Sequence, residues 1–319
     1  MIRLSQFTFL LAAIALVGAG AAPAALAWPG ANGAIVFEAF YPGGEEHDRG
    51  RGIRIAPLGA DRSEVVSLTD DPADGDPQVS PDGRQVVFVR SSDPGTFGHE
   101  PPTTIYLIRV DGSGLRPLTD GTQADDEPSF SASGSRVYFT RRVSGQGTDI
   151  FSVRLDGSGL RRITSGGASD RHPRLAARGG LLSFARGPGS DSSRQAHIFL
   201  ARADGSRVRD LTPRLASHLA ASDPEFTPDG RRVAYSTGDR LLSVRVDGKR
   251  PRLLLPPRAG SDRVYADPTF APDGRSLLFT ALDSSSASLQ QLDLRDLRRL
   301  PAPLVEPHTA ARSPAWLTG

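Results

Sequence analysis

Six residues, each followed directly by a proline, recur along the chain and bring together side chains that could do chemistry. They are Asp76, Glu127, His172, Asp223, Asp267 and Ser313. Four carboxylates and one imidazole around a common centre would hold a cation or repel one another and raise their pKa values. A divalent cation such as calcium is the one cofactor that these residue types suggest. The alternative is that the six only cap strand starts and bond to neighbouring backbone.

The prolines belong to a repeat that must position these side chains. Successive prolines lie 51, 45, 51, 44 and 46 residues apart, and a large apolar residue follows each proline by two positions. In the first five repeats an aromatic residue stands eleven positions after the proline. Self-similarity at this period indicates one supersecondary unit copied around or along an axis.

One repeat shows the pattern of the unit. Short apolar or alternating runs at 77–80, 85–90, 104–110 and 115–119 predict four strands. Pro-Asp-Gly at 81–83 and Asp-Gly-Ser-Gly at 111–114 predict tight hairpin turns. Pro117 places the last strand at a sheet edge. Four strands in about 45 residues are typical of a propeller blade.

The two ends of the chain predict how the ring closes. Residues 34–37 form a second strand with no first strand before it, and residues 313–317 form a first strand with nothing after it. Joined, they complete a sixth blade together with the runs 52–56 and 64–69, and Trp316 is expected in the core between blades. The prediction is an all-β, six-bladed β-propeller of four-stranded antiparallel blades, closed by the C-terminal strand joining the N-terminal blade.

In such a ring the residues before the prolines begin the innermost strands and should surround one mouth of the central channel. The longer connections 38–51, 91–103 and 186–196 open on the same face by antiparallel geometry. Variable loops on a rigid scaffold are where binding usually occurs. The predicted ligand or metal site therefore contains Asp76, Glu127, His172, Asp223 and Asp267.

Other motifs do not predict chemistry. The Asp-Gly pairs suit Asx-type turns and lack the spacing of a calcium loop. The Gly-x-Ser-x-Gly elbow of serine hydrolases is missing, so no catalytic residue is predicted.

The N-terminus resembles an export signal. Arg3 supplies a positive charge, residues 7–17 are apolar, and Ala25-Leu26-Ala27 fits a cleavage site, which predicts a signal peptide at 1–27 and a propeller at 28–319. The alternative is an uncleaved anchor, although the apolar run is short for a membrane span. An exported chain without cysteine has no disulfides. With 38 basic and 36 acidic residues and no basic block, no nucleic-acid partner is expected.

The repeats resemble those of TolB-like β-propellers, a branch of the WD-repeat-like group. The resemblance rests on the apolar-x-Pro-Asp-Gly-Arg motifs at 79–84, 226–231 and 270–275, and on the Asp-Gly-Ser-Gly-Leu-Arg motifs that lead to Leu-Thr or Ile-Thr at 111–119 and 156–164. It covers almost all of residues 32–316 and implies the propeller fold.

The function predicted from these observations is a non-enzymatic, exported scaffold, periplasmic or secreted, that binds a protein, small molecule or glycan in the cell envelope. No membrane span is expected after signal removal. The alternative is a metal-dependent hydrolase or lyase, resembling a lactonase or a polysaccharide lyase, with its site at the channel mouth.

Overall fold

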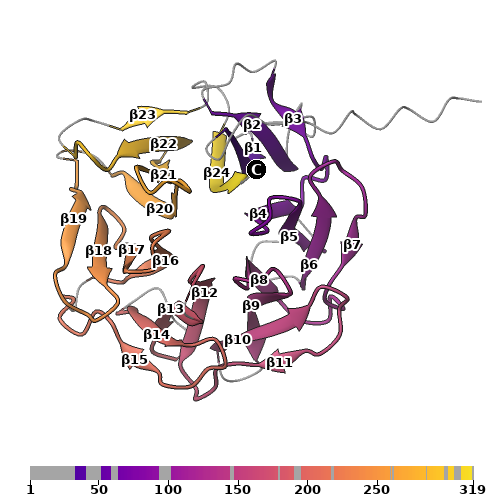
Figure 1. Ribbon diagram of the computed structural model, residues 1–319, viewed down its shortest axis with the longest axis horizontal. Helices are drawn as coiled ribbons and strands as arrows, with labels where there is room; N and C mark the ends of the chain where they lie inside the picture. Colours follow the sequence, from indigo (N-terminus) through magenta and orange to yellow (C-terminus); the bar gives the residue numbers. More distant parts are fainter. Residues whose placement is uncertain are drawn as a thin grey trace, which may run out of the picture.

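The chain forms a ring of six antiparallel sheets, with the innermost strand of each sheet toward the centre of the ring (Figure 1). The computed structural model describes residues 33–40, 52–58, 64–92, 102–143, 147–178, 180–189, 195–216, 219–258, 260, 262–284, 286–297, 301–304 and 310–317. The predicted signal at 1–27 lies outside these residues, as do most of the long connections 38–51 and 91–103 and the middle of 186–196. Within the described part of the chain, no helix is long and apolar enough to cross a lipid bilayer.

Each sheet is one four-stranded blade, which confirms the predicted fold class. From the channel outward, the first blade contains β24 (Ala310–Leu317), β1 (Ala34–Phe40), β2 (Gly52–Pro57) and β3 (Val66–Ser67). The second contains β4 (Asp74–Val79), β5 (Gln85–Ser91), β6 (Thr103–Arg109) and β7 (Arg116–Pro117). The third contains β8 (Asp125–Phe130), β9 (Arg136–Val143), β10 (Gly147–Arg154) and β11 (Arg161–Arg162).

The remaining three blades repeat this order. The fourth contains β12 (Ser169–Leu175), β13 (Leu181–Gly187), β14 (His197–Arg202) and β15 (Arg209–Asp210). The fifth contains β16 (Ser222–Phe226), β17 (Arg232–Ser236), β18 (Leu241–Arg245) and β19 (Arg252–Leu255). The sixth contains β20 (Val264–Phe270), β21 (Ser276–Leu282), β22 (Ala287–Asp293) and β23 (Ala302–Pro303). Most outer strands are two residues long, shorter than the sequence predicts.

The closure predicted for the ends of the chain is confirmed. β24 pairs with β1, with Trp316 opposite Ile35, so the first and last parts of the described chain share one sheet. Trp316 is 6% exposed and packs with Phe37, Leu278 and Leu289 between the first and sixth blades. Pairing with β24 covers the inner edge of β1, which would otherwise be an exposed sheet edge.

A β-bulge interrupts the innermost strand of every blade at the residue before the proline. In β4, Asp76 and Pro77 together face Phe88 alone, and the same two-to-one pairing recurs in the other five blades. This arrangement explains the spacing of eleven residues, because the repeated aromatic stands opposite the bulge. These aromatics are at most 3% exposed: Phe88, Phe139, Phe184, Tyr235 and Phe279.

The bulge corrects one expectation from the sequence. The six residues before the prolines lie inside their strands, one to three residues after the first, and not at the strand starts. Proline has no N–H to donate to the sheet, which suggests a strand start, but the bulge removes the need for that donor. The backbone of all six is left-handed, with φ from 48° to 55°.

Each of three neighbouring blades contains an equivalent buried ion pair close to its bulge. Asp74, Asp125 and Asp170, each at most 2% exposed, accept two hydrogen bonds from Arg90, Arg141 and Arg186, at 2.5–2.8 Å. Each guanidinium also lies over two aromatic rings, at 4.8–5.8 Å from their centroids. The pairs fix each innermost strand to the second strand of its blade.

The Asp-Gly motifs form turns, as predicted. Asp111 and Asp156 accept hydrogen bonds at 2.9 Å from the backbone N–H groups two residues later, and Asp82 does the same at 3.1 Å. This is the local bonding expected of Asx turns. These carboxylates therefore stabilise hairpin turns, which lie at the opposite end of the blades from the six residues that precede the prolines.

Candidate functional site at the channel mouth

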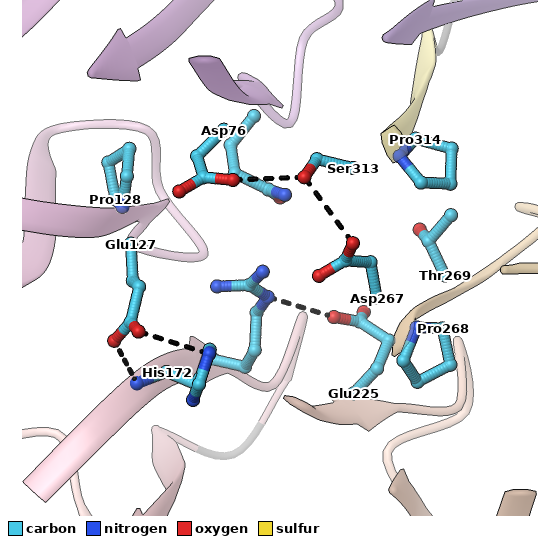
Figure 2. Close-up of a pocket in the computed structure, with 12 residues that line it drawn as sticks. Asp76, Glu127, Pro128, His172, Glu225, Asp267, Pro268, Thr269, Ser313 and Pro314 are labelled. Atoms are coloured by element: carbon cyan, nitrogen blue, oxygen red, sulfur yellow. Dashed lines mark hydrogen bonds and ion pairs between the residues drawn. The ribbon is translucent and has the colours of Figure 1, made fainter. Parts of the chain in front are cut away.

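The six bulges turn their side chains toward the channel, where the structure brings together all five residues predicted for the site. Figure 2 shows Asp76, Glu127, His172 and Asp267 with Ser313 around a small cavity. Asp223 belongs to the same group because its Oδ1 atom lies 3.0 Å from Nε2 of His172. The innermost strands of six blades thus contribute one residue each.

One side of the mouth is a charged network centred on His172. Its Nε2 atom lies 3.0 Å from Oε1 of Glu127 and 3.0 Å from Oδ1 of Asp223, and its backbone N–H donates to Oε2 of Glu127 at 2.7 Å. Glu127 also accepts hydrogen bonds from the Thr140 hydroxyl at 2.6 Å and from Arg171 at 3.2 Å. A protonated His172 and Arg171 therefore together balance the charges of two carboxylates from the neighbouring blades.

The pKa values follow from this geometry. Burial alone would lower the pKa of His172, but the Glu127 and Asp223 carboxylates outweigh it and raise the pKa to about 9. Burial would raise the pKa of Asp223, but the charge and hydrogen bond of His172 hold it at about 2. The pKa of Glu127 is likewise lowered, against its burial, by His172 and Arg171. At neutral pH this side carries the charged forms.

The opposite side has two carboxylates and a hydroxyl. The Ser313 hydroxyl lies 2.9 Å from Oδ1 of Asp76 and 3.3 Å from Oδ2 of Asp267. A hydroxyl carries one proton, so it can donate to only one of these carboxylates at a time. Burial, together with repulsion from Asp223 and Asp76, raises the pKa of Asp267 to about 7. Near neutral pH the Asp267 carboxyl is therefore partly protonated.

A second layer lies two residues further along the innermost strands. Arg174 pairs with Glu225 at 3.3 Å across neighbouring blades, and Gln78 and Thr269 complete the wall of the cavity. Burial raises the pKa of Glu225 to about 7 in spite of Arg174. These residues are not among those predicted from the sequence. The signal was available, because residues two apart on a strand point to the same side.

Polar groups at the outer edge of the mouth hold the innermost strands of the first and second blades together. Arg312 bonds to Oε1 of Glu38 at 2.7–2.9 Å, and the backbone N–H of Asp76 donates to Oε2 of Glu38 at 3.3 Å. A Cβ atom at Gly75 would lie 2.6 Å from that same oxygen, so a larger residue here would displace the carboxylate from its present position. Glu38 thus links the strands that close the ring to the second blade.

Comparison with known families supports the architecture. A family model described as the TolB beta propeller domain matches residues 48–263. The chain belongs to the TolB β-propeller family. The TolB structure from Acinetobacter baumannii superposes with a TM-score of 0.69 at 18% identity, over 89% of this chain and 66% of that one.

Other matches to this TolB-family chain are partial or distant. Oligogalacturonate lyase from Vibrio parahaemolyticus superposes with a TM-score of 0.55 at 13% identity, over 85% of this chain and 79% of that one. Dipeptidyl-peptidase 5 from Porphyromonas endodontalis is 32% identical over 68 residues, which are 21% of this chain and 10% of that protein. The two structural likenesses, to TolB and to the lyase, show the fold alone.

The cavity of this TolB-family propeller limits what can enter the mouth. Its volume is about 70 Å³. One water needs roughly 10–15 Å³ by this measure, so the cavity admits a few waters, a cation or the tip of one side chain. Among the described residues, no three His, Asp or Glu side chains converge in a way that could hold a metal ion. His172 instead occupies the space between the carboxylates nearest to it.

Proposed function

We propose that this TolB-family propeller is an exported, non-enzymatic binding protein and that its ligand or protein partner docks at the channel mouth. The observation that carries the proposal is the strained ring. Six residues other than glycine adopt φ near 50° directly before a proline. The left-handed region is disfavoured for such residues, by roughly 1–2 kcal/mol each. Strain of this kind clusters at binding sites, where the surrounding structure holds side chains ready for a partner.

The charges at the mouth favour a cationic group of the ligand. His172 and Arg171 balance the charges of Glu127 and Asp223, whereas Asp76 and Asp267 contact hydroxyl groups, of which they share that of Ser313. An ammonium or guanidinium group on this side would replace the proton of Asp267 and donate hydrogen bonds to both carboxylates. The cavity has room for such a tip, while the rest of the partner would lie outside it.

The interaction is tested by capture from the cell envelope of the source organism. Immobilised protein is compared with the Asp76→Asn/Asp267→Asn variant and with Asp229→Asn/Asp273→Asn, which removes two carboxylates from hairpin turns distant from the mouth. A partner retained by the wild type and by the hairpin variant, but lost with the mouth variant, supports the proposal. A partner that all three proteins retain equally places binding elsewhere.

Export has its own test. N-terminal sequencing of protein from the periplasm or medium should begin at Trp28, after cleavage behind Ala27. Recovery of uncleaved chain from the cytoplasm alone would contradict export, whatever the mouth binds.

We place a metal-dependent hydrolase or lyase second. It ranks second because, among the residues that the structure describes, no three His, Asp or Glu side chains converge to hold a metal ion. Calorimetric titration with Ca²⁺ and Mn²⁺ distinguishes the two functions. Stoichiometric binding that Asp76→Asn/Asp267→Asn abolishes would favour the metal-dependent enzyme.

A further inference from the structure

The face away from the mouth carries a concentration of positive charge that the overall composition conceals. The hairpins joining the third and fourth strands of blades two to five form this surface, here called the basic hairpin face. Its four segments are 109–116, 154–162, 202–209 and 245–252. They contain twelve Lys or Arg residues against four Asp residues, although the whole chain has 38 basic and 36 acidic residues. All twelve basic residues are exposed.

The strand register places these hairpins at one end of the blades. In the second blade Arg90, at one end of β5, pairs with Asp74 beside the mouth, whereas Gln85, at the other end, pairs with Arg109 at the start of the hairpin. Neighbouring hairpins are also in contact. Arg116 donates to the carbonyl of Leu155 in the next blade, and Arg209 donates to that of Val246. Gly205 of the fourth blade lies against the backbone of Ile163, directly after the hairpin of the third blade. The four segments therefore form a continuous arc on one side of the ring.

The negative charges within the arc are largely committed to the turns. Asp111, Asp156 and Asp204 each accept the backbone N–H two residues later at 2.9 Å, which fixes these carboxylates in the hairpins. Asp247 does the same at 3.0 Å and lies 3.4 Å from Arg245. Arg162 is paired with Asp149, outside the arc. The face remains strongly positive after these pairs are counted.

Apolar side chains project between the basic ones. Leu115, Leu160 and Val208 occupy the same place in three successive hairpins and are 46%, 47% and 40% exposed. Each is followed directly by an arginine. Large apolar residues exposed at equivalent positions on one face suit a partner with an apolar layer beneath a polar surface.

We propose that the basic hairpin face docks the protein on the surface of an anionic lipid bilayer. Arginine and lysine would contact the lipid phosphates, while the three apolar tips enter the head-group region. A bilayer fits better than an acidic protein or glycan, because the arc spans four blades of a flat ring and its apolar residues stand on turns. Docked in this way, the channel mouth faces away from the membrane and stays open to a partner.

The test is co-sedimentation of the full chain with vesicles of phosphatidylcholine, with and without phosphatidylglycerol. The apolar segment 7–17 would bind both vesicles alike, so the quantity measured is the ratio of anionic to neutral binding. Lys249→Glu/Arg252→Glu should lower that ratio by more than about 25-fold, since each basic residue near the surface strengthens binding about fivefold. Arg142→Glu/Arg258→Glu makes the same charge change toward the mouth end of the third and fifth blades and should leave the ratio within about twofold.

The apolar tips separate a bilayer from a soluble polyanion. Leu115→Ser/Leu160→Ser should weaken binding to the anionic vesicles and leave binding to polyglutamate unchanged. Equal ratios for the wild type and Lys249→Glu/Arg252→Glu would overturn the proposal. Binding to polyglutamate without binding to vesicles would also overturn it and assign the face to an acidic macromolecule.

Discussion

His172 and Asp223 face each other from neighbouring blades, with 3.0 Å between Nε2 and Oδ1. Glu127 lies at the same distance from that nitrogen on the other side. The imidazolium therefore acts as the internal counter-ion of the mouth. Since three blades contribute one group each, its protonation links the packing of the blades to pH.

This relationship predicts that stability falls in alkali. The pKa of His172 is about 9 in the folded chain and near 6.5 when unfolded, so the folded state binds the extra proton between these values. This contribution to the free energy of unfolding is complete below pH 6.5 and is lost as pH rises through 9, a change of roughly 3 kcal/mol. Denaturant unfolding from pH 6 to 10 measures this slope. His172→Gln should remove most of it, and a variant with the wild-type slope would contradict the assignment.

The buried Asp170–Arg186 pair predicts a strong coupling in a double-mutant cycle. Either Asp170→Asn or Arg186→Gln leaves a buried partner unsatisfied and should cost about 3–5 kcal/mol in the free energy of unfolding. The double variant should cost clearly less than the sum of the two. Arg245 and Asp247, whose side chains are 47% and 43% exposed, provide a matched control, where about 0–1 kcal/mol is expected. Additive effects at the buried pair would show that the two residues act separately.

Ring closure predicts that the C-terminal strand is essential for stability. Trp316→Ala should lower the free energy of unfolding by about 3–5 kcal/mol, because the indole fills the core between the first and sixth blades. Removal of 313–319 should be still more damaging. Leu160→Ala, on an exposed turn, should change stability by no more than about 0.5 kcal/mol. Thermal unfolding of the truncated chain at the wild-type temperature would refute closure through β24.

The sequence predicted the ring and its closure because both depend on local patterns that repeat. It misplaced the strand starts because a proline is normally a sign of a strand edge or end, and only the register reveals that Asp76 and Pro77 share one partner. The Asp–Arg pairs were also missed, although their separation of 16 residues recurs three times. To predict that each Asp stands opposite its Arg, one must know that the bulge adds one residue to the innermost strand between them. The role of His172 as a counter-ion depends on distances, which residue types do not supply.

The left-handed backbone at the bulges predicts that glycine is more stabilising than alanine there, the reverse of their order elsewhere in a strand. Asp267 has φ of 50°, where a Cβ atom is disfavoured, so Asp267→Gly should be about 1–2 kcal/mol more stable than Asp267→Ala. Both variants lose the same carboxylate and its bonds to Ser313 and Thr280, so their difference isolates the backbone. At Thr269, two residues along the same strand beyond the bulge, glycine should instead be about 0.5–1 kcal/mol less stable than alanine. Equilibrium unfolding of the four variants decides the matter. The same order at both positions would mean that the ring is not strained, and it would remove the observation on which binding at the mouth is proposed.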